Sequence, residues 1–354
     1  MRTFLIALCA VFSFLFLPTI YVVADVPSAI SGVVPHLVRI ETIGGHERVG
    51  SELANEGTST GILLNQEGYV ITGAFNFLHD PTSILLVFSD GTKKVAQKIA
   101  TDRLRMLTLL KANDFSGNEL PPLPMRSKES LRIGERCIAV GTVLSPVEPN
   151  VTLGIISGKN RIWGKAIQTD AAIGPNNYGG LLIDFEGNVL GIPVPLSMMS
   201  QDVMAGAELY DAGVGMAIPW EDMLTLLPKL KEGNDLSPGS VGFGFRDNQT
   251  FIGEPVIATV QPDSAAERGG LRVGDRIVRI DDTPMPTALA VTKNLRQRYA
   301  GETLTIVFQR EGAEQTISLT TTPIRTGNRT NVEYAVEYAP TGYRHTSSNV
   351  NAGR

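Results

Sequence analysis

The first two thirds of the chain are dominated by short apolar runs in which hydrophobic and polar positions alternate. Between residues 35 and 219, runs such as LVRIETI, TGILLNQEGYVIT, ERCIAVGT and GNVLGIPV are separated by Gly, Asn, Asp and Pro. A period of two is typical of half-buried β-strands, and frequent turn residues favour antiparallel connections. This region therefore predicts an antiparallel β-barrel or sandwich.

The alternation gives way to a helical pattern in PWEDMLTLLPKLKEG, residues 219–233. Gly233 ends the pattern, and its apolar residues recur at helical spacing at Met223, Leu224, Leu227 and Leu230. The next stretch, NDLSPGS at residues 234–240, is polar and contains Pro and Gly, as is typical of a linker between domains. The chain is therefore expected to enter a second domain after residue 240.

That second domain is predicted over residues 241–323. GFGFRD, PVIATVQPDSAAERGGLRVGDRIVRIDD, a helix expected around Thr287 to Tyr299, and LTIVFQREGAEQTISLTT together form one compact mixed unit. Residues 324–354 are polar, with Asn, Thr, Ser and Gly dominating the end. Such a composition predicts a largely disordered tail.

The first 24 residues carry a targeting signal. Arg2 is followed by an apolar run that ends in small residues at Val22, Val23 and Ala24. This pattern favours a signal peptide cleaved after Ala24. The alternative is an uncleaved membrane anchor, because residues 3–24 are about long enough to span a bilayer. On either interpretation, the rest of the chain lies outside the cytosol, either periplasmic or secreted, or held at the membrane.

Composition excludes several classes of function. With 31 basic and 36 acidic residues, the net charge is −5 and the charges are dispersed, so nucleic acid is not expected as a partner. Cys9 lies in the signal, and Cys137, in the apolar run CIAV, is expected to be a buried small side chain rather than a reactive thiol. Four scattered histidines give no metal-ligand spacing, and GFGF and ERGGLRVGD lack the context of a phosphate-binding loop, so no metal or cofactor is predicted.

Several segments, in one order along the chain, resemble the HtrA/DegP family of serine proteases. They are TSTGILLNQEGYVIT, LTLLKA, LRIGERCIAVGT, VTLGIISGKNR, TDAAIGPNNYGGLLIDFEGNVLGI and GVGMAIPWEDM. The resemblance implies a mainly β protein. A trypsin-like double antiparallel β-barrel with a C-terminal helix would occupy residues 25–233, and a small α+β PDZ domain would occupy residues 241–323.

The same resemblance places substitutions at all three catalytic positions. Counting along GYVITGAFN puts Phe75 where the family has its histidine, and DRLRMLTLLK puts Met106 at the aspartate. Tyr178 precedes the Gly-Gly pair, where the family has its nucleophilic serine, and Asn176 replaces a glycine that helps to shape the oxyanion hole. A hydroxyl nucleophile needs an adjacent base and the base needs an acidic partner, and neither Phe75 nor Met106 can supply these groups.

The substitutions predict a pseudoprotease, with Phe75, Met106 and Tyr178 forming an apolar plug in the former cleft. His79 beside Asp80 is the candidate for a rebuilt base, but a helical turn after the strand would displace it from Tyr178. Tyr178 itself is a poor nucleophile, because an unperturbed phenol has a pKa of about 10.

The PDZ resemblance implies a peptide-binding site. Phe243, Gly244 and Phe245 in SVGFGFR look like the loop that receives a C-terminal carboxylate. Val291 and Leu295, one helical turn apart, would line the pocket for the last apolar side chain, with the alternative that both are ordinary core residues of the helix.

The expected function is binding or regulation of proteins outside the cytosol, through the PDZ domain and the degenerate cleft. The expected partners are C-terminal or extended peptides, and active protease relatives. A homo-oligomer, a trimer in much of the family, is implied by the resemblance alone. The alternatives are a weak or non-standard serine-type endopeptidase in protein quality control, and a chaperone-like holdase without cleavage.

Overall fold

The computed structural model describes residues 25–44, 48–49, 52–53, 57–77, 81–117, 119–196, 213–246 and 253–324. The signal segment at 1–24, the tail from residue 325, and three of the four histidines, His46, His79 and His345, lie outside these residues. The chain divides into two compact units, Met1–Leu236 and Ser237–Arg354, and each unit is described by itself. Within the described ranges, no helix is both long and apolar enough to cross a bilayer.

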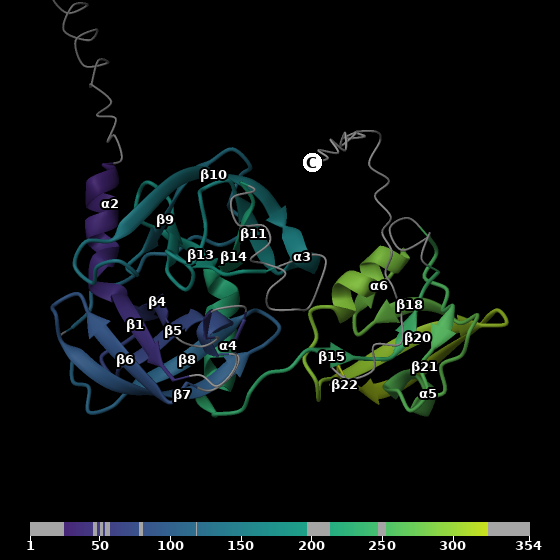
Figure 1. The fold of residues 1–354 in the computed structure, drawn as a ribbon. Coiled ribbons are helices and arrows are strands. Elements are labelled where there is room, and N and C mark those ends of the chain that lie inside the picture. The colour runs from purple at the N-terminus through teal and green to yellow at the C-terminus, as the bar shows by residue number, and fades with distance from the viewer. Residues whose placement is uncertain are drawn as a thin grey trace, which may run out of the picture. The chain divides into compact units, whose positions relative to one another are not determined.

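The first unit begins with a closed antiparallel barrel (Figure 1). Its strands follow one another around the barrel in the order β1 (Leu37–Ile43), β4 (Gly57–Leu63), β5 (Tyr69–Gly73), β8 (Leu107–Ala112), β7 (Lys93–Asp102) and β6 (Ser83–Phe88). A separate two-stranded pair joins β2 (Arg48–Val49) to β3 (Glu52–Leu53). Alternate residues of the barrel strands, such as Val38, Val70 and Leu110, point inward and form its core.

A second closed barrel completes the first unit. Its order is β10 (Asn150–Asn160), β11 (Ala166–Thr169), β14 (Gly215–Pro219), β13 (Val189–Pro193), β12 (Leu181–Ile183) and β9 (Arg136–Gly141). The interior is filled by what is called here the second-barrel cluster, which includes Cys137, Ile156, Ile167, Leu182 and Leu190. Two closed barrels confirm the antiparallel barrel predicted from the alternating pattern.

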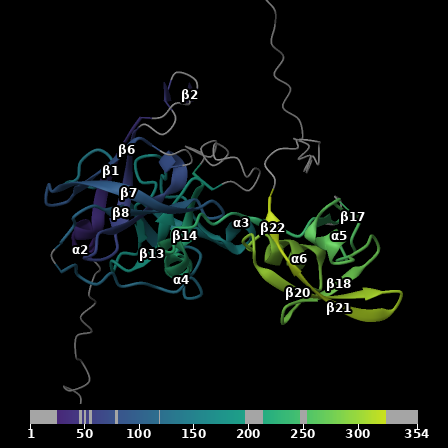
Figure 2. The ribbon, with the colours of Figure 1, turned by 90° about the horizontal axis from the view of Figure 1, so that it is seen from below.

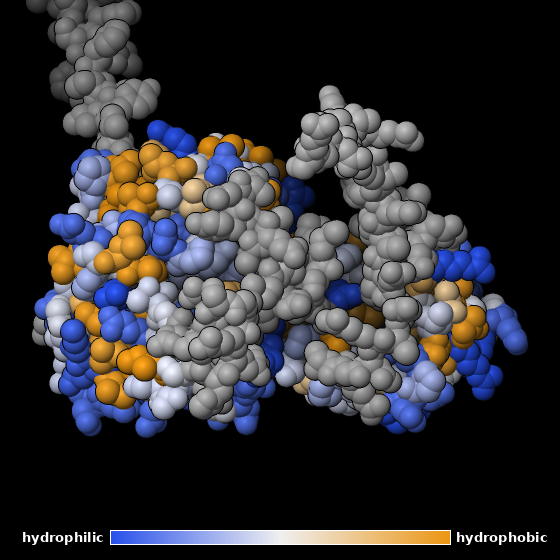
Figure 3. Space-filling model, viewed as in Figure 1, coloured by the Kyte–Doolittle hydropathy of each residue, from blue (hydrophilic) through white to orange (hydrophobic). Residues whose placement is uncertain are grey.

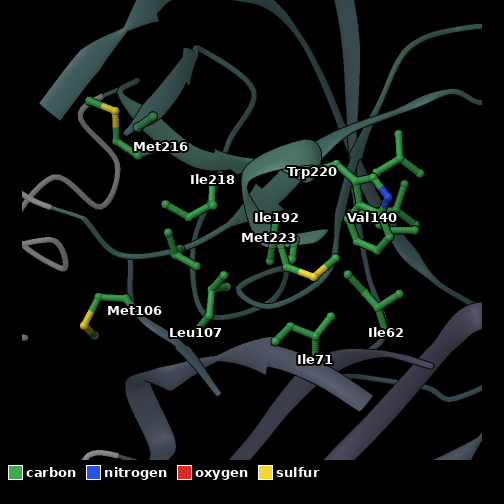
Figure 4. Close-up of a cluster of buried hydrophobic side chains, with 14 of the residues drawn as sticks. Ile62, Ile71, Met106, Leu107, Val140, Ile192, Met216, Ile218, Trp220 and Met223 are labelled. Carbon is green, nitrogen blue, oxygen red and sulfur yellow. The ribbon is translucent and has the colours of Figure 1, made fainter. Parts of the chain in front are cut away.

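The two barrels are joined by a larger apolar cluster, called here the inter-barrel cluster (Figure 4). Ile62 and Ile71 of the first barrel face Val140 and Ile218 of the second across it. Helical segments also border the barrels, among them α2 (Val26–Val33), the single turn η1 (Val34–His36) and α4 (Trp220–Lys231). Helices α2 and α4 both contribute buried side chains to the cluster.

Helix α4 coincides with the helix predicted over residues 219–233, and part of its apolar pattern is buried. Trp220, Met223, Leu226 and Leu230 are buried, whereas Leu224 is 39% exposed. Trp220 packs in the inter-barrel cluster at the first position of the helix, and the buried stripe that follows it passes through Leu226.

The turn between β10 and β11 has an unusual backbone. It forms the short element α3 (Arg161–Gly164), in which Ile162 and Trp163 have φ of 49° and 61°. A β-branched residue in the left-handed region costs roughly 1–2 kcal/mol, and burial of the Ile162 side chain in the inter-barrel cluster offsets this cost.

The second unit is a small α+β domain (Figure 2). Its main sheet has the order β19 (Thr283–Pro284), β18 (Arg276–Ile280), β20 (Thr303–Arg310) and β21 (Ala313–Thr320). Two short pairs join β15 (Gly239–Ser240) to β22 (Thr322–Pro323), and β16 (Phe243–Gly244) to β17 (Thr259–Val260). The helices are α5 (Ala265–Arg268) and α6 (Ala288–Leu295), and the Thr287 hydroxyl caps α6 by accepting from the N–H of Ala290.

Candidate functional site

The backbones around Phe75, Met106 and Tyr178 meet at one place in the first unit. Phe75 lies in η2 (Ala74–Phe77), directly after β5, and the neighbouring Ala74 N–H donates to the Met106 carbonyl at 2.8 Å. The Tyr178 carbonyl accepts from the N–H of Thr60 on β4 at 3.4 Å. Three sequence positions far apart in the chain are thus brought together where β5, β8 and β12 begin or end.

Gly179 packs tightly at this junction. Its φ is +78°, and a Cβ on it would lie 2.5 Å from Thr72 Oγ1 and 2.6 Å from the Gly73 nitrogen. Its own N–H donates to the Pro193 carbonyl at 2.8 Å. A residue with a side chain would therefore separate the two barrels at this point, since backbone atoms cannot move aside.

The side chains at the three positions do not form one plug. Tyr178 is 7% exposed and belongs to the second-barrel cluster, so its ring lies inside that barrel. Met106 is also buried, but in the inter-barrel cluster, while Phe75 is half-buried in η2. The hypothesis of a single apolar plug is corrected: the tyrosine fills the end of the second barrel instead of the former cleft.

Met106 adopts a backbone that suits a different residue type. Its φ is 58°, in the left-handed region that Asp and Asn tolerate better than Met. The conformation is held by the bond from Ala74 and by two hydrogen bonds to Asp102 Oδ1, which accepts from the N–H groups of Leu104 and Arg105. Burial of the Met106 thioether compensates for the local strain.

In the loop before Tyr178, backbone N–H groups donate to acceptors within the loop itself. Gly174 O accepts from the N–H groups of both Asn177 and Tyr178 at 3.0 Å, and the Asn177 side chain returns a bond by accepting from the Gly174 N–H at 2.9 Å. The Asn176 carbonyl accepts from Asn150 Nδ2 at 3.0 Å. In this arrangement the Tyr178 N–H is not directed at an incoming oxyanion, as a catalytic donor must be.

This closed turn was missed by the sequence analysis. GPNN is a strong turn signal, because Gly, Pro and Asn each favour turns for a separate conformational reason. The pattern could have predicted a turn closed on Gly174. It could not have shown that the turn captures the Tyr178 N–H, which depends on the exact backbone path.

Two other candidate chemical groups, His36 and Cys137, are buried. His36 is buried, and its ring nitrogens lie 2.9 Å from the Leu63 carbonyl and 2.8 Å from the Pro121 carbonyl. Cys137 is fully buried, with its Sγ 3.1 Å from Thr169 Oγ1, and burial raises the pKa of the thiol to about 11. Its prediction as a buried small side chain is confirmed. In the part of the chain that the structure describes, no three His, Cys, Asp or Glu side chains are grouped to hold a metal.

The second candidate site lies in the second unit, at strand β16. Gly242 O accepts from the Gln261 N–H, and Gly244 O accepts from the Ala258 N–H, both at 2.8 Å. In an antiparallel pair successive residues point their backbone groups to opposite edges, so those of Phe243 point away from β17. Among the described residues β17 is the only strand paired with β16, which leaves the Phe243 edge unpaired.

Apolar side chains accompany this open edge. Phe243 and Phe245 stack edge to face, with ring centroids 5.7 Å apart, and both pack against the core cluster that contains Val291 of α6. Val291 is fully buried, whereas Leu295 is half-buried against the same cluster. Val291 is therefore an ordinary core residue of the helix, as the alternative prediction had it. Leu295 retains surface that a ligand can contact.

Conformational demands explain the glycines of this loop. Gly242 has φ of +88° and lies against the Ser264 side chain, while a Cβ on Gly244 would lie 2.8 Å from Thr259 Oγ1. Directly before β18, Asp275 is 1% exposed and accepts from Arg310 Nε and Nη2 and from the Arg272 N–H, each at 2.7 Å. Burial alone would raise the pKa of Asp275, but these hydrogen bonds outweigh it and lower the pKa below its usual range.

Comparison with known proteins agrees with this division of the chain. The profile of the trypsin-like peptidase domain matches residues 59–192, and that of the PDZ domain matches residues 239–321. Serine endoprotease DegS of Escherichia coli (strain K12) is 27% identical over 307 residues, which cover 82% of this chain and 84% of DegS. Serine protease PepD of Mycobacterium tuberculosis is 28% identical over 309 residues, covering 81% of this chain and 64% of PepD.

Solved structures show the same fold. The HtrA-type protease AlgW with a tripeptide superposes with a TM-score of 0.66 at 25% identity, covering 86% of this chain and 99% of AlgW. The serine endoprotease from Yersinia pestis superposes with a TM-score of 0.62 at 24% identity, covering 85% and 98%. The predicted fold class, a trypsin-like double barrel followed by a PDZ domain, is confirmed. The chain therefore consists of a trypsin-like peptidase domain followed by one PDZ domain, and it is homologous to the HtrA, DegS and DegP serine proteases.

Proposed function

We propose that this chain is a non-catalytic member of the HtrA/DegP-like proteins that binds the C-terminal or extended segments of other proteins through its PDZ domain. The observation that carries the proposal is the edge of β16 on which no described strand is paired, flanked by Phe243, Phe245 and Leu295. A peptide added as an extra strand would satisfy the free backbone groups of Phe243. Its alternate side chains would contact the apolar surface.

Relatives support a peptide as the ligand. AlgW has been solved with a tripeptide, and another AlgW structure contains a decapeptide. The glycines of the loop allow close approach of a carboxylate to backbone N–H groups, because neither carries a Cβ. A C-terminal carboxylate is therefore the group expected at the end of the bound strand.

The non-catalytic part of the proposal is supported by the chemistry at Phe75, Met106 and Tyr178. None of these side chains can serve as a base or as its acidic partner. The N–H of Tyr178 is already bonded to Gly174. In a serine protease that carries the same triad on a different fold, the loss of the triad lowers turnover by a factor on the order of 10⁶.

The proposed location is outside the cytosol. It is supported by the apolar N-terminal segment of the sequence and by a relative from Pseudomonas fulva named "probable periplasmic serine endoprotease DegP-like", which is 27% identical over 81% of this chain. Whether residues 3–24 stay attached as an anchor would be decided by N-terminal sequencing of the mature protein.

The binding proposal is tested with matched peptides. Fluorescently labelled peptides from a C-terminal library are titrated with the whole chain, and each one that binds is compared with its C-terminal amide. The free acids are expected to bind at least roughly tenfold more tightly than the amides, because the amide removes the charge that the loop receives. Equal affinity of acid and amide, or no binder in the library, would refute carboxylate-dependent binding.

A weak endopeptidase remains the competing function, because the relatives are serine proteases. A serine-directed covalent probe and a peptide-cleavage assay distinguish it from the proposed binding protein. Labelling that disappears in both Tyr178→Phe and His79→Ala would favour the endopeptidase.

A further inference from the structure

A repeated tetrapeptide occurs in the polar tail that follows the PDZ domain. Residues 332–339 read VEYAVEYA, called here the VEYA repeat, and Pro340 follows them directly. In an extended chain, four apolar side chains of the repeat would share one face: Val332, Tyr334, Val336 and Tyr338. β-Branched and aromatic residues in such an alternation are typical of a strand. A single strand is not stable alone in water, so this segment needs a sheet edge to join.

A sheet edge of this kind lies in the PDZ domain itself. Among the described residues β17 is the only strand paired with β16, and the backbone groups of Phe243 point away from β17. Phe243, Phe245 and Leu295 are half-buried beside this edge. Figure 3 shows hydrophobic as well as hydrophilic surface on the second unit. The edge therefore offers backbone groups that no described strand pairs with, together with apolar side chains.

The tail begins close to this edge. Strand β22, at the end of the described chain, pairs with β15, which ends at Ser240 (Figure 1). Strand β16 begins at Phe243, and the backbone from Ser240 to Phe243 spans at most about 11 Å. Residues 325–331, between the described chain and the VEYA repeat, can extend over roughly 23 Å. The connection is therefore long enough to place the repeat on β16.

We propose that the VEYA repeat adds to the edge of β16 as an extra strand and so occupies the peptide site of its own PDZ domain. The inference rests on the proposed function, because it concerns the same edge. The apolar face of the repeat would contact Phe243, Phe245 and Leu295, and the backbone groups of Phe243 would gain partners.

The tether favours the chain's own tail over a free partner. A segment on a short flexible linker is held at an effective concentration on the order of millimolar, so it competes with every peptide in solution. An external peptide then binds only by displacing the tail. The tail thereby sets a threshold of affinity that a partner of the PDZ domain must exceed.

Hydrogen exchange of the Phe243 amide tests the contact directly, in the full chain without added peptide. The amide is expected to be protected in the wild type, and the double variant Tyr334→Ser, Val336→Ser should exchange roughly tenfold faster or more. The matched control is Ala335→Ser with Ala339→Ser, because these positions lie on the other face of the repeat and should leave protection unchanged. The Tm verifies that all the variants fold.

Equal exchange of the Phe243 amide in the wild type and in the double variant would overturn the inference. Whether external peptides bind would still be decided by their own titration, so the two proposals fail separately. Protection that is lost in the double variant, while no peptide binds to either chain, would support the inference and refute the binding of external peptides. Protection that increases with protein concentration would assign the edge to the tail of another copy and overturn the inference.

Peptide titration tests the competition itself. A labelled C-terminal peptide is expected to bind the double variant about tenfold more tightly than the wild type, because the tethered competitor has been removed. The alanine-to-serine control should bind the peptide as the wild type does. A peptide that binds with equal affinity to the wild type and to the double variant would overturn the role of the tail as a competitor.

Discussion

The junction around Tyr178 and the loop around Phe243 differ in their backbone hydrogen bonds: those of the junction are made within the protein, and some of those of the loop are left for a ligand. At the junction the Tyr178 N–H is bonded to Gly174 and the Gly179 N–H to Pro193. At β16 the backbone groups of Phe243 face an edge without a partner strand among the described residues. Both regions are rich in glycine, yet in one the glycines close the packing and in the other they leave access.

The difference suggests two roles: the residues of the junction serve packing, and the residues of the β16 loop serve binding. Tyr178 is buried inside a barrel, and Gly179 holds the barrels together, so changes at the junction should mainly affect stability. Leu295 is half-buried at the surface of the PDZ core, so a change there should mainly affect affinity.

The largest effect is expected from Gly179→Ala. The added Cβ would meet Thr72 Oγ1 and the Gly73 nitrogen, and the left-handed φ adds strain, so the free energy of unfolding should fall by about 4 kcal/mol or more. Gly134→Ala is the matched control: Gly134 has φ of +91°, but a Cβ there would have no neighbouring atom within 4 Å, and the change should cost about 1 kcal/mol. Denaturant unfolding measures both, and equal losses would show that the junction is not tightly packed.

Tyr178→Ser should destabilise the first unit by about 3–4 kcal/mol, because it empties the space of a large buried ring. Tyr178→Phe keeps the ring and should stay within about 1 kcal/mol of the wild type. Chemical denaturation of the two variants is the measurement. If Tyr178→Ser were as stable as the wild type, the tyrosine would not serve the packing of the second barrel.

In the PDZ domain, Arg310→Met should cost about 3 kcal/mol at neutral pH, because it leaves the buried Asp275 carboxylate without its charged partner. The pKa of Asp275 is lowered in the folded state, so its contribution is present above the unfolded pKa of roughly 3.9 and is lost as the pH falls through the folded value. The difference in unfolding free energy between wild type and variant should therefore be full at pH 7 and shrink below about pH 4. A difference that is constant with pH would contradict this role of the pair.

The smallest effect is expected from Leu295→Ala, which should weaken binding of a C-terminal peptide by about tenfold, or 1.4 kcal/mol. Lys293→Ala, on the same helix at an exposed position, should leave the affinity unchanged. Titration of both variants with one labelled peptide compares them. Similar losses in the two variants would place the bound peptide away from the Leu295 side of α6.

Much of the fold could be predicted from alternation and turn residues. LVRIETI was expected as a strand and forms β1, and the helix expected around Thr287 begins with Thr287 as its cap. The helix ends at Leu295, before the expected Tyr299, because residues 296–298 turn the chain back toward β15. The left-handed turn at Ile162 contradicts local preference and could not be predicted, since only burial of its side chains supports it.

For the candidate sites, the sequence predicted which residues take part but not where their side chains point. The positions of Phe75, Met106 and Tyr178 followed from motif order, but the direction of the Tyr178 ring did not, because a residue before a Gly-Gly pair can point into either the cleft or the barrel. The distinction between Val291 and Leu295 also required the structure, since both are apolar residues on one helix face.

The most direct test of a binding protein without catalysis is to recover the bound peptide. A C-terminal peptide that binds through its free carboxylate is incubated with the chain for many times its dissociation half-life and is then analysed by mass spectrometry. The account predicts that only the intact peptide is recovered, at saturating as well as at low protein concentration. Cleavage products formed by the wild-type chain that are absent with Tyr178→Phe would contradict it.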